Sequence, residues 1–459
     1  MLKNKVNRPS FCDIITRKIL KEVFMENNSF FEKAFKLKKR KTDFKTEIMA
    51  GITTFMTMSY ILAVNPQILG EAGMDKGAVF TSTIIASVIA ILIMAFYANL
   101  PFALAPGMGL NAFFTYTVVL TMGKPWQFAL TAVFVEGIVF IILSAFNVRE
   151  AIFNAIPISL KKAVSVGIGL FIALIGLLNS SVIVSNDIGL GLGKLVSKES
   201  FVFFIGLIIM AVLTAKKVKG ALLIGIVLST IIALFTGVST LPEHGIIQLP
   251  PSISPIAFKL DFSNIFSFEM FSVVFAFLFV DIFDTVGTLT GVATKANMLD
   301  EEGKLPDVGK ALFADAIGTT FGALLGTSTV TTFVESATGV AEGGRSGLTA
   351  LACGVCFALS IFFYPLIAII PSQATAAALV MVGLFMIDSI TDINFGDFTE
   401  SFPAFMTIIM MPFAYSIAEG IAFGMISYAI VKTLTGKAKE VSPLVYVLAL
   451  VFLLRYIFA

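Results

Sequence analysis

The stretch NLPFALAPGMGLNAFFTYTVV, residues 99–119, lies in a long apolar run but contains two prolines and two glycines where a continuous membrane helix would be expected. A second stretch, GTSTVTTFVESATGVAEGG at 326–344, carries a β-branched run, Thr327 to Val334, and ends in glycines. Irregular backbone at membrane depth is tolerated only where protein or a water-filled cavity satisfies it. Each stretch is therefore predicted to be a short extended segment followed by a half-helix. A competing interpretation is that the glycines only allow close helix packing.

The composition indicates a helical membrane protein. Of the 459 residues, 57% are hydrophobic and 14% are charged, whereas soluble domains average about 25% charged residues. Residues 77–123 and 346–387 contain no charged residue and no histidine. Each run is about twice the roughly 20 residues that a helix needs to cross a bilayer. We expect an all-α polytopic protein that lies in the lipid bilayer.

Apolar windows divide the chain into two halves around a break at 238–266 that is rich in proline, serine and charge. The windows lie at 47–69, 78–99, 103–121, 126–147, 163–179, 200–215, 219–237, 268–291, 309–326, 328–343, 347–370, 372–388, 401–416 and 418–434. Seven spans in each half predict a 7+7 inverted repeat, because an odd number of spans turns the second copy over. The interrupted third span of each half points to the central site of a transporter. The segment 442–458 suits a further span or an interfacial helix.

Basic residues in short loops predict that the N-terminus is cytoplasmic. They gather at 36–41, 149–162, 216–219 and 432–439. Residues 1–45 alternate charged residues with phenylalanine and do not resemble a signal peptide, so we expect a cytoplasmic leader. Met25 opens a stretch that is a complete leader by itself, which suggests that residues 1–24 are an upstream extension.

Several classes of function are disfavoured. Three cysteines cannot form a disulfide framework, and His244 is the only histidine, so we expect no metal and no cofactor. The chain lacks a phosphate-binding GxxxxGK[ST] loop, and its two neighbouring aspartates share one helix, unlike those of an intramembrane protease. We expect neither an enzyme nor a nucleic-acid partner, although the net charge of +2 by itself says little about partners.

Two acids interrupt the apolar segment VVFAFLFVDIFDTVGTLTG at 273–291. Asp281 and Asp284 lie three residues apart and share one helical face. An intramembrane acid costs about 2.5–3.5 kcal/mol on insertion, so it is expected to face a cavity or a partner. Glu335 is expected at the start of the second half-helix. We predict that Asp281 and Glu335 bind substrate or a proton, and that Asp281 contacts substrate while Asp284 supports it.

Other polar and aromatic residues complete the candidate site. Asn111 follows the first break and can donate and accept hydrogen bonds, and Thr332 belongs to the β-branched run. Phe113 and Phe114 form an aromatic wall or simply pack. Acids that can take up a proton and accept N–H donors suit a neutral, planar, N–H-rich substrate carried with H⁺. The proton-coupling candidates are Asp281, Glu335 and Asp284.

Three further acids are predicted to have structural roles. Asp315 follows a charged loop and is expected to hold the cytoplasmic end of its span. Glu136 and Glu419 are expected to serve packing or gating rather than to contact a ligand.

Five motifs resemble one family. They are TEIMAGITTFMTMSYILAVNPQIL (46–69), APGMGLNAFF (105–114), FLFVDIFDTVGTLTGVA (277–293), FADAIGTTFGALLGTSTVTTFVESATGV (313–340) and EGGRSGLTAL (342–351). Together they resemble the adenine/guanine/hypoxanthine permeases, the azaguanine-transporter-like branch of the nucleobase–ascorbate transporter (nucleobase:cation symporter) family. The resemblance covers residues 46 to 434. The wider family has an asparagine directly after the span 10 acid, but here Ser336 follows Glu335, which fits the hypoxanthine branch and leaves the role of Ser336 open.

The resemblance implies an importer of purine nucleobases in the cell membrane that works by proton symport and alternating access, and it allows a homodimer. It implies a core domain (46–148 and 268–370) that moves against a gate domain (163–237 and 372–434), followed by a tail at 435–459. It also places the purine against Asn111, Asp281, Asp284 and Glu335.

Two other functions are weighed against this one. An anion transporter of the sulfate or bicarbonate type on the same fold would need a neutral or positive site, which Asp281 and Glu335 oppose. A membrane receptor without transport activity would not need interrupted spans that carry acids.

Overall fold

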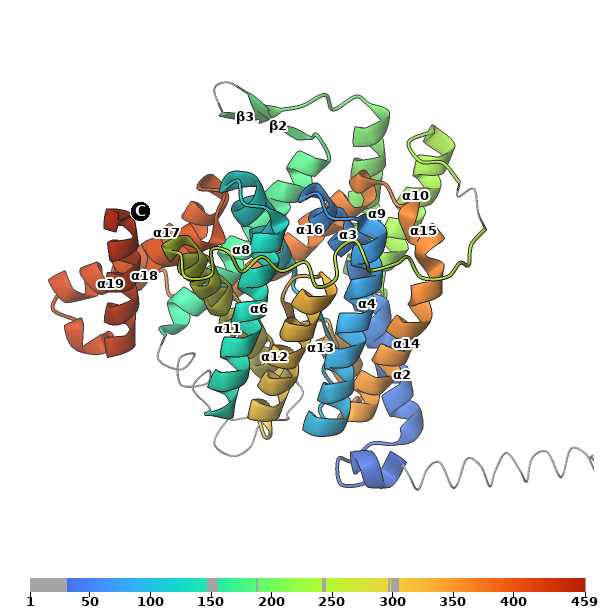
Figure 1. Cartoon of the computed structure of the whole chain (residues 1–459), viewed down its shortest axis with the longest axis horizontal. Coiled ribbons are helices and arrows are strands. Elements are labelled where there is room, and N and C mark those ends of the chain that lie inside the picture. Colours follow the sequence, from blue (N-terminus) through green and yellow to red (C-terminus); the bar gives the residue numbers. More distant parts are fainter. Residues whose placement is uncertain are drawn as a thin grey trace, which may run out of the picture.

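The chain is built almost entirely of helices (Figure 1). The computed structural model describes residues 31–146, 156–186, 189–241, 245–295, 298 and 305–458. Ten helices in this part of the chain are long and apolar enough to cross a membrane. The prediction of an all-α polytopic membrane protein is confirmed, whereas the count of fourteen spans and the inverted repeat remain predictions. Residues 1–24, Arg149 and His244 lie outside the described residues.

The elements of the first half begin with a helix pair and end before the break at 238–266. They are α2 (Phe44–Met58), α3 (Ile61–Glu71), α4 (Lys76–Ile93), η1 (Met94–Ala98), β1 (Leu104–Pro106), α5 (Met108–Ala112), η2 (Phe113–Thr121), α6 (Trp126–Ala145), α8 (Ile158–Asn179), β2 (Ile183–Asn186), β3 (Gly189–Leu192), α9 (Lys198–Ala215) and α10 (Ala221–Thr236).

The second half repeats the same kinds of element and adds a C-terminal helix. Its elements are α11 (Phe268–Lys295), α12 (Val308–Leu325), β4 (Val330–Thr332), α13 (Ser336–Ala341), α14 (Gly347–Ser360), η3 (Ile361–Phe363), α15 (Tyr364–Ala368), α16 (Ser372–Ile387), η4 (Asp388–Asp392), α17 (Phe398–Phe413), α18 (Ile417–Leu434), η5 (Ala438–Glu440) and α19 (Pro443–Phe458).

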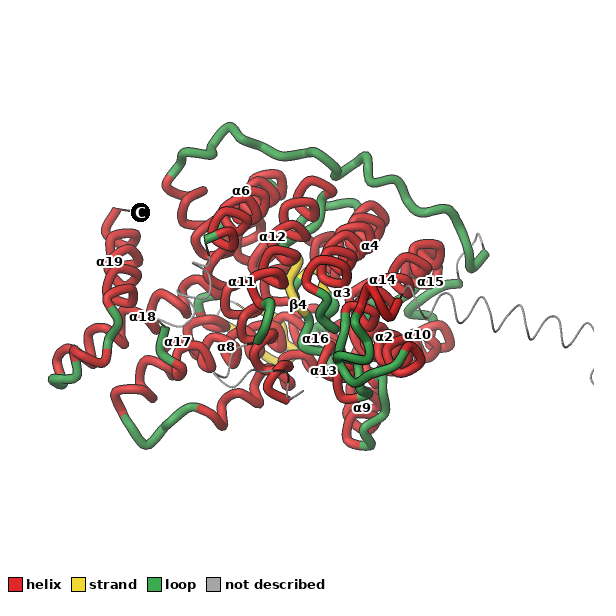
Figure 2. Tube along the Cα trace, turned by 90° about the horizontal axis from the view of Figure 1, so that it is seen from below, coloured by secondary structure: helices red, strands yellow, loops and turns green. Residues whose placement is uncertain are grey.

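The helices pack as two groups (Figure 2). The first helix group contains α2, α3, α4, α6, α11, α12, α13 and α14. The second helix group contains α8, α9, α10, α16, α17 and α18. Helix α8 also contacts α5 and α11, so it lies where the two groups meet. Helix α19 packs against α18.

The two ends of the bundle differ in their loops. The β2–β3 hairpin follows α8 directly and marks what we call the hairpin end (Figure 1). Helices α2 and α3 form one span from Phe44 to Glu71. Asn179, at the end of α8, donates from Nδ2 to Glu71 Oε1 at 2.8 Å, which places Glu71 at the hairpin end. The basic residues 36–41 therefore lie at the opposite end, which we call the basic end.

A buried acid joins α2 to α14. The Glu47 carboxylate is fully buried and accepts hydrogen bonds from the backbone N–H groups of Arg345 (2.8 Å), Ser346 (3.3 Å) and Thr349 (3.1 Å). The first N–H groups of a helix have no partner within the helix and carry a partial positive charge. Glu47 satisfies these groups at the start of α14, and this structural role explains an acid that the sequence analysis did not weigh.

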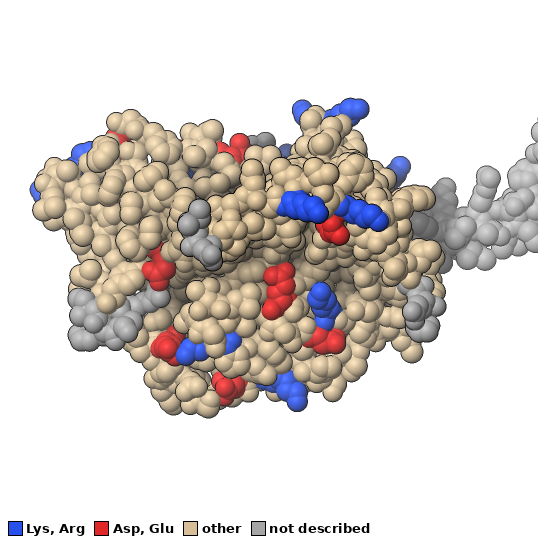
Figure 3. All heavy atoms as spheres, turned by 90° about the horizontal axis from the view of Figure 1, so that it is seen from above, with Lys and Arg blue, Asp and Glu red and all other residues tan. Residues whose placement is uncertain are grey.

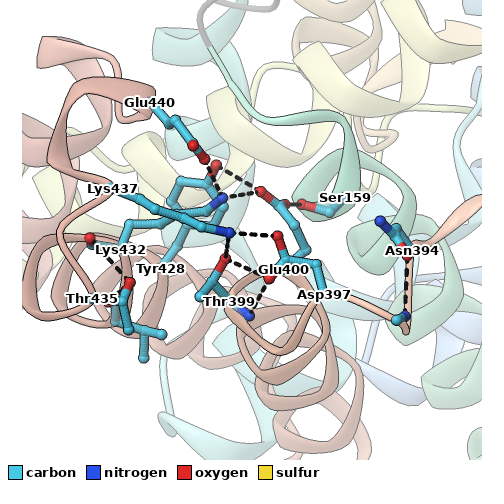
Figure 4. A network of polar contacts seen from close by, with 12 residues as sticks. Ser159, Asn394, Asp397, Thr399, Glu400, Tyr428, Lys432, Thr435, Lys437 and Glu440 are labelled. Carbon is cyan, nitrogen blue, oxygen red and sulfur yellow. Dashed lines mark hydrogen bonds and ion pairs between the residues drawn. The ribbon is translucent and has the colours of Figure 1, made fainter.

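A second polar cluster, which we call the Lys432 network, joins residues of α8, α17, α18 and η5 around a buried lysine (Figure 4). The ammonium of Lys432 contacts Glu400 Oε1 at 2.5 Å and Glu440 Oε2 at 2.6 Å, and its side chain is 2% exposed. Glu400 also accepts hydrogen bonds from Ser159 and from Tyr428. The prediction that Lys432 belongs to a loop after the last span is wrong, because it lies in the last turn of α18 and is buried.

A more exposed ion pair borders the Lys432 network. Lys437 Nζ contacts Asp397 Oδ2 at 2.7 Å, and Asp397 also accepts from the hydroxyl of Thr399 at 2.8 Å. The hydrogen bond from Lys437, followed by those from Thr399, holds the pKa of Asp397 below its ordinary range. The stabilisation from this pair is therefore present above the ordinary pKa of an aspartate and is lost as the pH falls through the lowered value.

Candidate functional site

Two buried strands meet inside the first helix group. β1 and β4 pair in antiparallel register, with Leu104 opposite Thr332 and Pro106 opposite Val330. The pairing extends beyond the strands, because Gly107 N donates to Thr329 O and Phe333 N donates to Ala103 O, each at 3.0 Å. Two extended segments from opposite halves of the chain thus satisfy one another's backbone groups in the interior.

A short helix follows each strand. α5 begins at Met108 and continues as the π-helix η2 to Thr121, and α13 runs from Ser336 to Ala341 with Glu335 at its N-cap. The prediction of an extended segment followed by a half-helix is confirmed in both stretches. The second extended segment is shorter than the β-branched run predicted. Strand β4 covers only Val330–Thr332. Ser336 Oγ accepts a hydrogen bond from Ala103 N at 3.0 Å, which assigns it a structural role.

Hydroxyl side chains of β4 and of the three residues before it form hydrogen bonds with four helices. The contacts are Asn65 Nδ2 to Thr327 at 3.0 Å, Ser328 to Asn111 Oδ1, Thr329 to Glu136 Oε2 at 2.7 Å, and Thr331 to Thr285 at 2.6 Å. Each partner belongs to a different helix: α3, α5, α6 and α11. The strand therefore holds the helices around the site in one arrangement.

The two aspartates of α11 have different surroundings. Asp281 is fully buried and accepts a hydrogen bond from Thr285 at 2.9 Å. Asp284 remains partly exposed, and its charged neighbours are Asp315 and Glu335. Asp284 is therefore the more exposed of the two aspartates, and the division of labour in which Asp281 contacts the substrate and Asp284 supports it remains a prediction.

Glu335 is held by an aromatic hydroxyl from the first span. Tyr60 OH donates to Glu335 Oε1 at 2.7 Å, and the Glu335 side chain is partly exposed. Tyr60 lies in the break between α2 and α3 and also neighbours Asp284. The sequence analysis missed Tyr60, because its partner is 275 residues away and no local pattern marks it.

Several buried polar atoms have no hydrogen-bond partner among the described residues, and one donor and one hydroxyl of this kind lie near the strands. These are Asn111 Nδ2 and Thr332 Oγ1. A buried donor without a partner costs about 1–3 kcal/mol, so such atoms are unusual unless a ligand or water satisfies them. Phe113 lies beside Asn111 and packs edge-on against Phe277, with ring centroids 4.8 Å apart. Its contact in this structure is therefore packing.

The remaining acids are placed as follows. Asp315 does not hold the end of its span as predicted, since it is fully buried within α12 and accepts a hydrogen bond from Thr285 at 2.9 Å. Glu136 is buried and bound by Thr329, and Glu419 accepts from Tyr456 of α19. No cluster of three histidine, cysteine or acidic residues in the described ranges is arranged to hold a metal ion.

One side of α11 after Asp284 is not covered by other described residues. A Cβ atom added at Gly287 or Gly291 would meet no atom of the described residues within 4 Å beyond the neighbouring backbone of α11, and Val334, next to Glu335, is 54% exposed. Gly287 and Gly291 lie one and two turns beyond Asp284 on the same side of the helix. Asp284, which is partly exposed, thus lies on a side of α11 that other described residues leave uncovered at Gly287 and Gly291.

Gly107 is expected to be indispensable for this geometry. An added Cβ would lie 2.4 Å from Thr331 Cγ2 and 3.3 Å from Asp284 Oδ2. Gly107→Ala is therefore expected to lower the free energy of unfolding by about 1–3 kcal/mol, the usual cost of overpacking. Unfolding in detergent micelles measures this loss. Gly287→Ala is the control: with open space around it, the substitution should stabilise the helix by up to about 1 kcal/mol. Equal effects of the two substitutions would contradict the packing argument.

Residues 45–423 match the profile described as the permease family. The chain belongs to the permease family. This permease is 52% identical to a putative permease of Methanocaldococcus jannaschii, over 94% of this chain and 98% of the relative. It is 44% identical to the adenine permease AdeP of Escherichia coli (93% and 96% covered) and 45% identical to the guanine/hypoxanthine permease PbuO of Bacillus subtilis (92% and 99% covered). The predicted resemblance is confirmed, and this permease is a transporter rather than an enzyme.

Solved structures share the fold of this permease at low identity. The transmembrane domain of the cyanobacterial bicarbonate transporter BicA superposes with a TM-score of 0.64 at 16% identity, covering 82% of this chain and 96% of that chain. The murine anion transporter Slc26a9, in its inward-facing state, gives a TM-score of 0.62 at 12% identity, with 85% and 68% covered. These likenesses concern the fold alone.

Proposed function

We propose that this permease imports purine nucleobases together with protons across the cell membrane, with its N-terminus in the cytoplasm. The observation that carries the proposal is the pair of partly exposed acids, Asp284 and Glu335, beside the unpartnered Asn111 Nδ2 and Thr332 Oγ1. The names of the relatives, adenine permease and guanine/hypoxanthine permease, support a purine as the substrate.

A purine base carries hydrogen-bond donors and acceptors that complement the groups of this site. Its ring and exocyclic N–H groups can donate to Asp284 and Glu335, and a hydrogen bond to a carboxylate is about twice as strong as one between neutral groups. Its ring nitrogens and carbonyl oxygens can accept from Asn111 Nδ2 and from the hydroxyl of Thr332. A planar base fits a site that combines a few oriented polar groups with apolar walls.

An anion substrate on the same fold is disfavoured by charge. Asp284 and Glu335 are close electrostatic neighbours, and Tyr60 already donates its hydroxyl to Glu335. A bicarbonate or sulfate ion would be repelled by both carboxylates, so the likeness to anion transporters does not extend to their substrates.

Transport is proposed to occur by movement of the first helix group, as the core domain, against the second, as the gate domain. In this structure polar contacts join the groups at the hairpin end, around a face that is hollowed between its charged residues (Figure 3). The contacts, which we call the outer clasp, are Asn179 with Glu71 and Tyr116, Gln67 with Thr375, and Thr117 with Tyr415 O. The uncovered side of α11 at Gly287 and Gly291 and the closed outer clasp suit a state that faces the basic end.

Loosening the outer clasp should shift the permease toward a state that is open at the hairpin end. Asn179→Ala removes two hydrogen bonds, worth about 1–2 kcal/mol together, so the ratio of the two states should change about 5- to 30-fold. The measurement is labelling of a cysteine introduced at Gly287, in a chain without native cysteines, by an impermeant thiol reagent added from the basic end. Labelling should fall in the Asn179 variant. Ser180→Ala is the control, since its hydroxyl bonds only Leu177 O within α8. Unchanged labelling after Asn179→Ala would show that the outer clasp does not stabilise the state that faces the basic end.

The substrate is tested by uptake of labelled adenine, guanine and hypoxanthine into cells that lack their own purine permeases. Uptake should exceed that of cells carrying an empty vector and should rise when the outside is made acidic. Absence of uptake for all three bases, with the protein present in the membrane, would refute the proposed function.

A further inference from the structure

The hydroxyl of Thr285 lies at the centre of a cluster that the substrate site does not account for. Its oxygen is 2.9 Å from Asp281 Oδ1, 2.9 Å from Asp315 Oδ1 and 2.6 Å from Thr331 Oγ1. Asp281, Thr285 and Asp315 are fully buried, and Thr331 is 1% exposed. The cluster joins α11, α12 and β4 behind the exposed acids.

The number of protons in this cluster can be counted. A threonine hydroxyl donates one proton and accepts through two lone pairs, whereas an ionised carboxylate only accepts. If each of the three oxygen–oxygen contacts around Thr285 is a full two-centre hydrogen bond, the cluster needs three protons. Thr285 and Thr331 supply one each, so the third contact is complete only when one of the two aspartates carries a proton.

The negative charges of the Asp281 and Asp315 carboxylates also favour one bound proton. The Asp281 and Asp315 oxygens lie within the same hydrogen-bonding shell of one hydroxyl, in a site without solvent exposure. Two carboxylates that share a site do not readily ionise together, and they take up protons as a pair rather than singly.

We propose that the coupling proton is carried by the Asp281–Asp315 pair, and that Thr285 and Thr331 are positioning residues for it. The inference rests on the proposed function and assigns its proton to Asp281 and Asp315 rather than to Asp284 and Glu335. Loading forms one O–H bond on one carboxylate, so the charge of the pair changes from −2 to −1. Unloading breaks that bond and releases the proton to water.

The cluster is physically connected to the substrate site through β4. Thr331 precedes Thr332 in the strand. Its Cγ2 lies 2.4 Å from the position that a Cβ on Gly107 would take, and the same position is 3.3 Å from Asp284 Oδ2. If the pair loses its proton, the third contact is lost and the two carboxylates repel one another, which disturbs Thr331 and the strand. Protonation of the pair thus favours the strand geometry that presents the substrate ligands.

Other ionisable groups surround the pair. Within the first helix group, Asp284 shares α11 with Asp281, Glu136 comes from α6 and Glu335 from the start of α13. Glu136 accepts a hydrogen bond from Thr329 and Glu335 accepts one from Tyr60, and Asp284 is an electrostatic neighbour of Asp315. The neighbouring helices α8 and α18 carry their charges near their ends, at Lys161, Lys162, Glu419 and Lys432.

The test separates coupling from substrate binding in proteoliposomes. Asp315→Asn keeps the shape of the side chain and offers a permanent N–H donor to Thr285, so it mimics the protonated pair. It should reduce accumulation driven by a pH gradient at least about tenfold while counterflow of labelled purine at equal pH stays within about threefold of wild type. The pH dependence of counterflow should also disappear. Asp281→Asn should behave in the same way.

Glu136→Gln is the matched control, because it too is a buried acid bound by a threonine of the same segment. It should retain accumulation driven by the gradient. The inference is overturned if Asp315→Asn still accumulates purine, if it loses counterflow together with accumulation, or if Glu136→Gln loses accumulation equally. Failure of wild-type counterflow would instead refute purine transport itself, so the two proposals fail in different ways.

Discussion

Purine uptake is expected to fall about 10- to 100-fold when Glu335 is replaced by glutamine, because a hydrogen bond to a charged group contributes about 1.5–3 kcal/mol. The substitution keeps the shape of the side chain and the hydrogen bond from Tyr60 OH, seen here at 2.7 Å, but it removes the charge that attracts purine N–H groups. Initial rates of labelled purine uptake measure the effect, and counterflow at equal pH should fall in parallel. This parallel loss distinguishes Glu335 from Asp315.

The control for this substitution is Glu269→Gln in the first turn of α11. Glu269 forms an exposed ion pair with Lys124 at 2.5 Å and lies outside the site. Such pairs contribute about 0–1 kcal/mol, so uptake should change less than about fivefold. If Glu335→Gln transports as well as Glu269→Gln, the site assignment is wrong.

Replacing Lys432 by methionine is expected to lower the free energy of unfolding by about 3–5 kcal/mol, because it leaves the partly buried Glu400 without its cation. Lys432 Nζ contacts both Glu400 and Glu440, and its side chain is 2% exposed (Figure 4). Equilibrium unfolding in mixed micelles measures the loss. A companion variant, Lys432→Met with Glu400→Leu, should recover part of the stability, since an apolar pair often replaces a buried ion pair at little cost.

Lys437→Met provides the matched control. Lys437 pairs with Asp397 at 2.7 Å, but both side chains are about one-third exposed, and exposed pairs contribute about 1 kcal/mol or less. Equal losses for Lys432→Met and Lys437→Met would show that burial does not decide the strength of the Lys432 network.

Local sequence patterns predicted the helices and the two interruptions because the chemistry that causes them is local. Proline removes a backbone donor and glycine loosens the backbone, so Pro101, Pro106 and Gly107 close together favour an interruption, and the β-branched run before Glu335 favours extended backbone. Span boundaries followed the edges of the apolar windows, as in α6, predicted at 126–147 and observed at Trp126–Ala145. Acids in apolar windows were correctly expected to have partners.

The identity of those partners could not be predicted. Tyr60 and Glu335 are 275 residues apart, and Thr285 and Asp315 are 30 apart on different helices. Helix rotation and strand register decide these contacts, and neither is encoded in a short window. Asp315 was assigned to the end of its span from a nearby charged loop, although its position inside an apolar helix was itself a signal of a buried role.

The pairing of β1 with β4 also sets the order in which the protein can be completed. The two strands are more than 200 residues apart, so the first has no backbone partner until about three-quarters of the chain has been synthesised. Contacts of such long sequence separation form slowly, and unpaired strand edges invite misassembly in the meantime. During synthesis and membrane insertion, the first half therefore carries β1 without its strand partner. A chain that terminates before residue 330 lacks β4 and cannot form this pair.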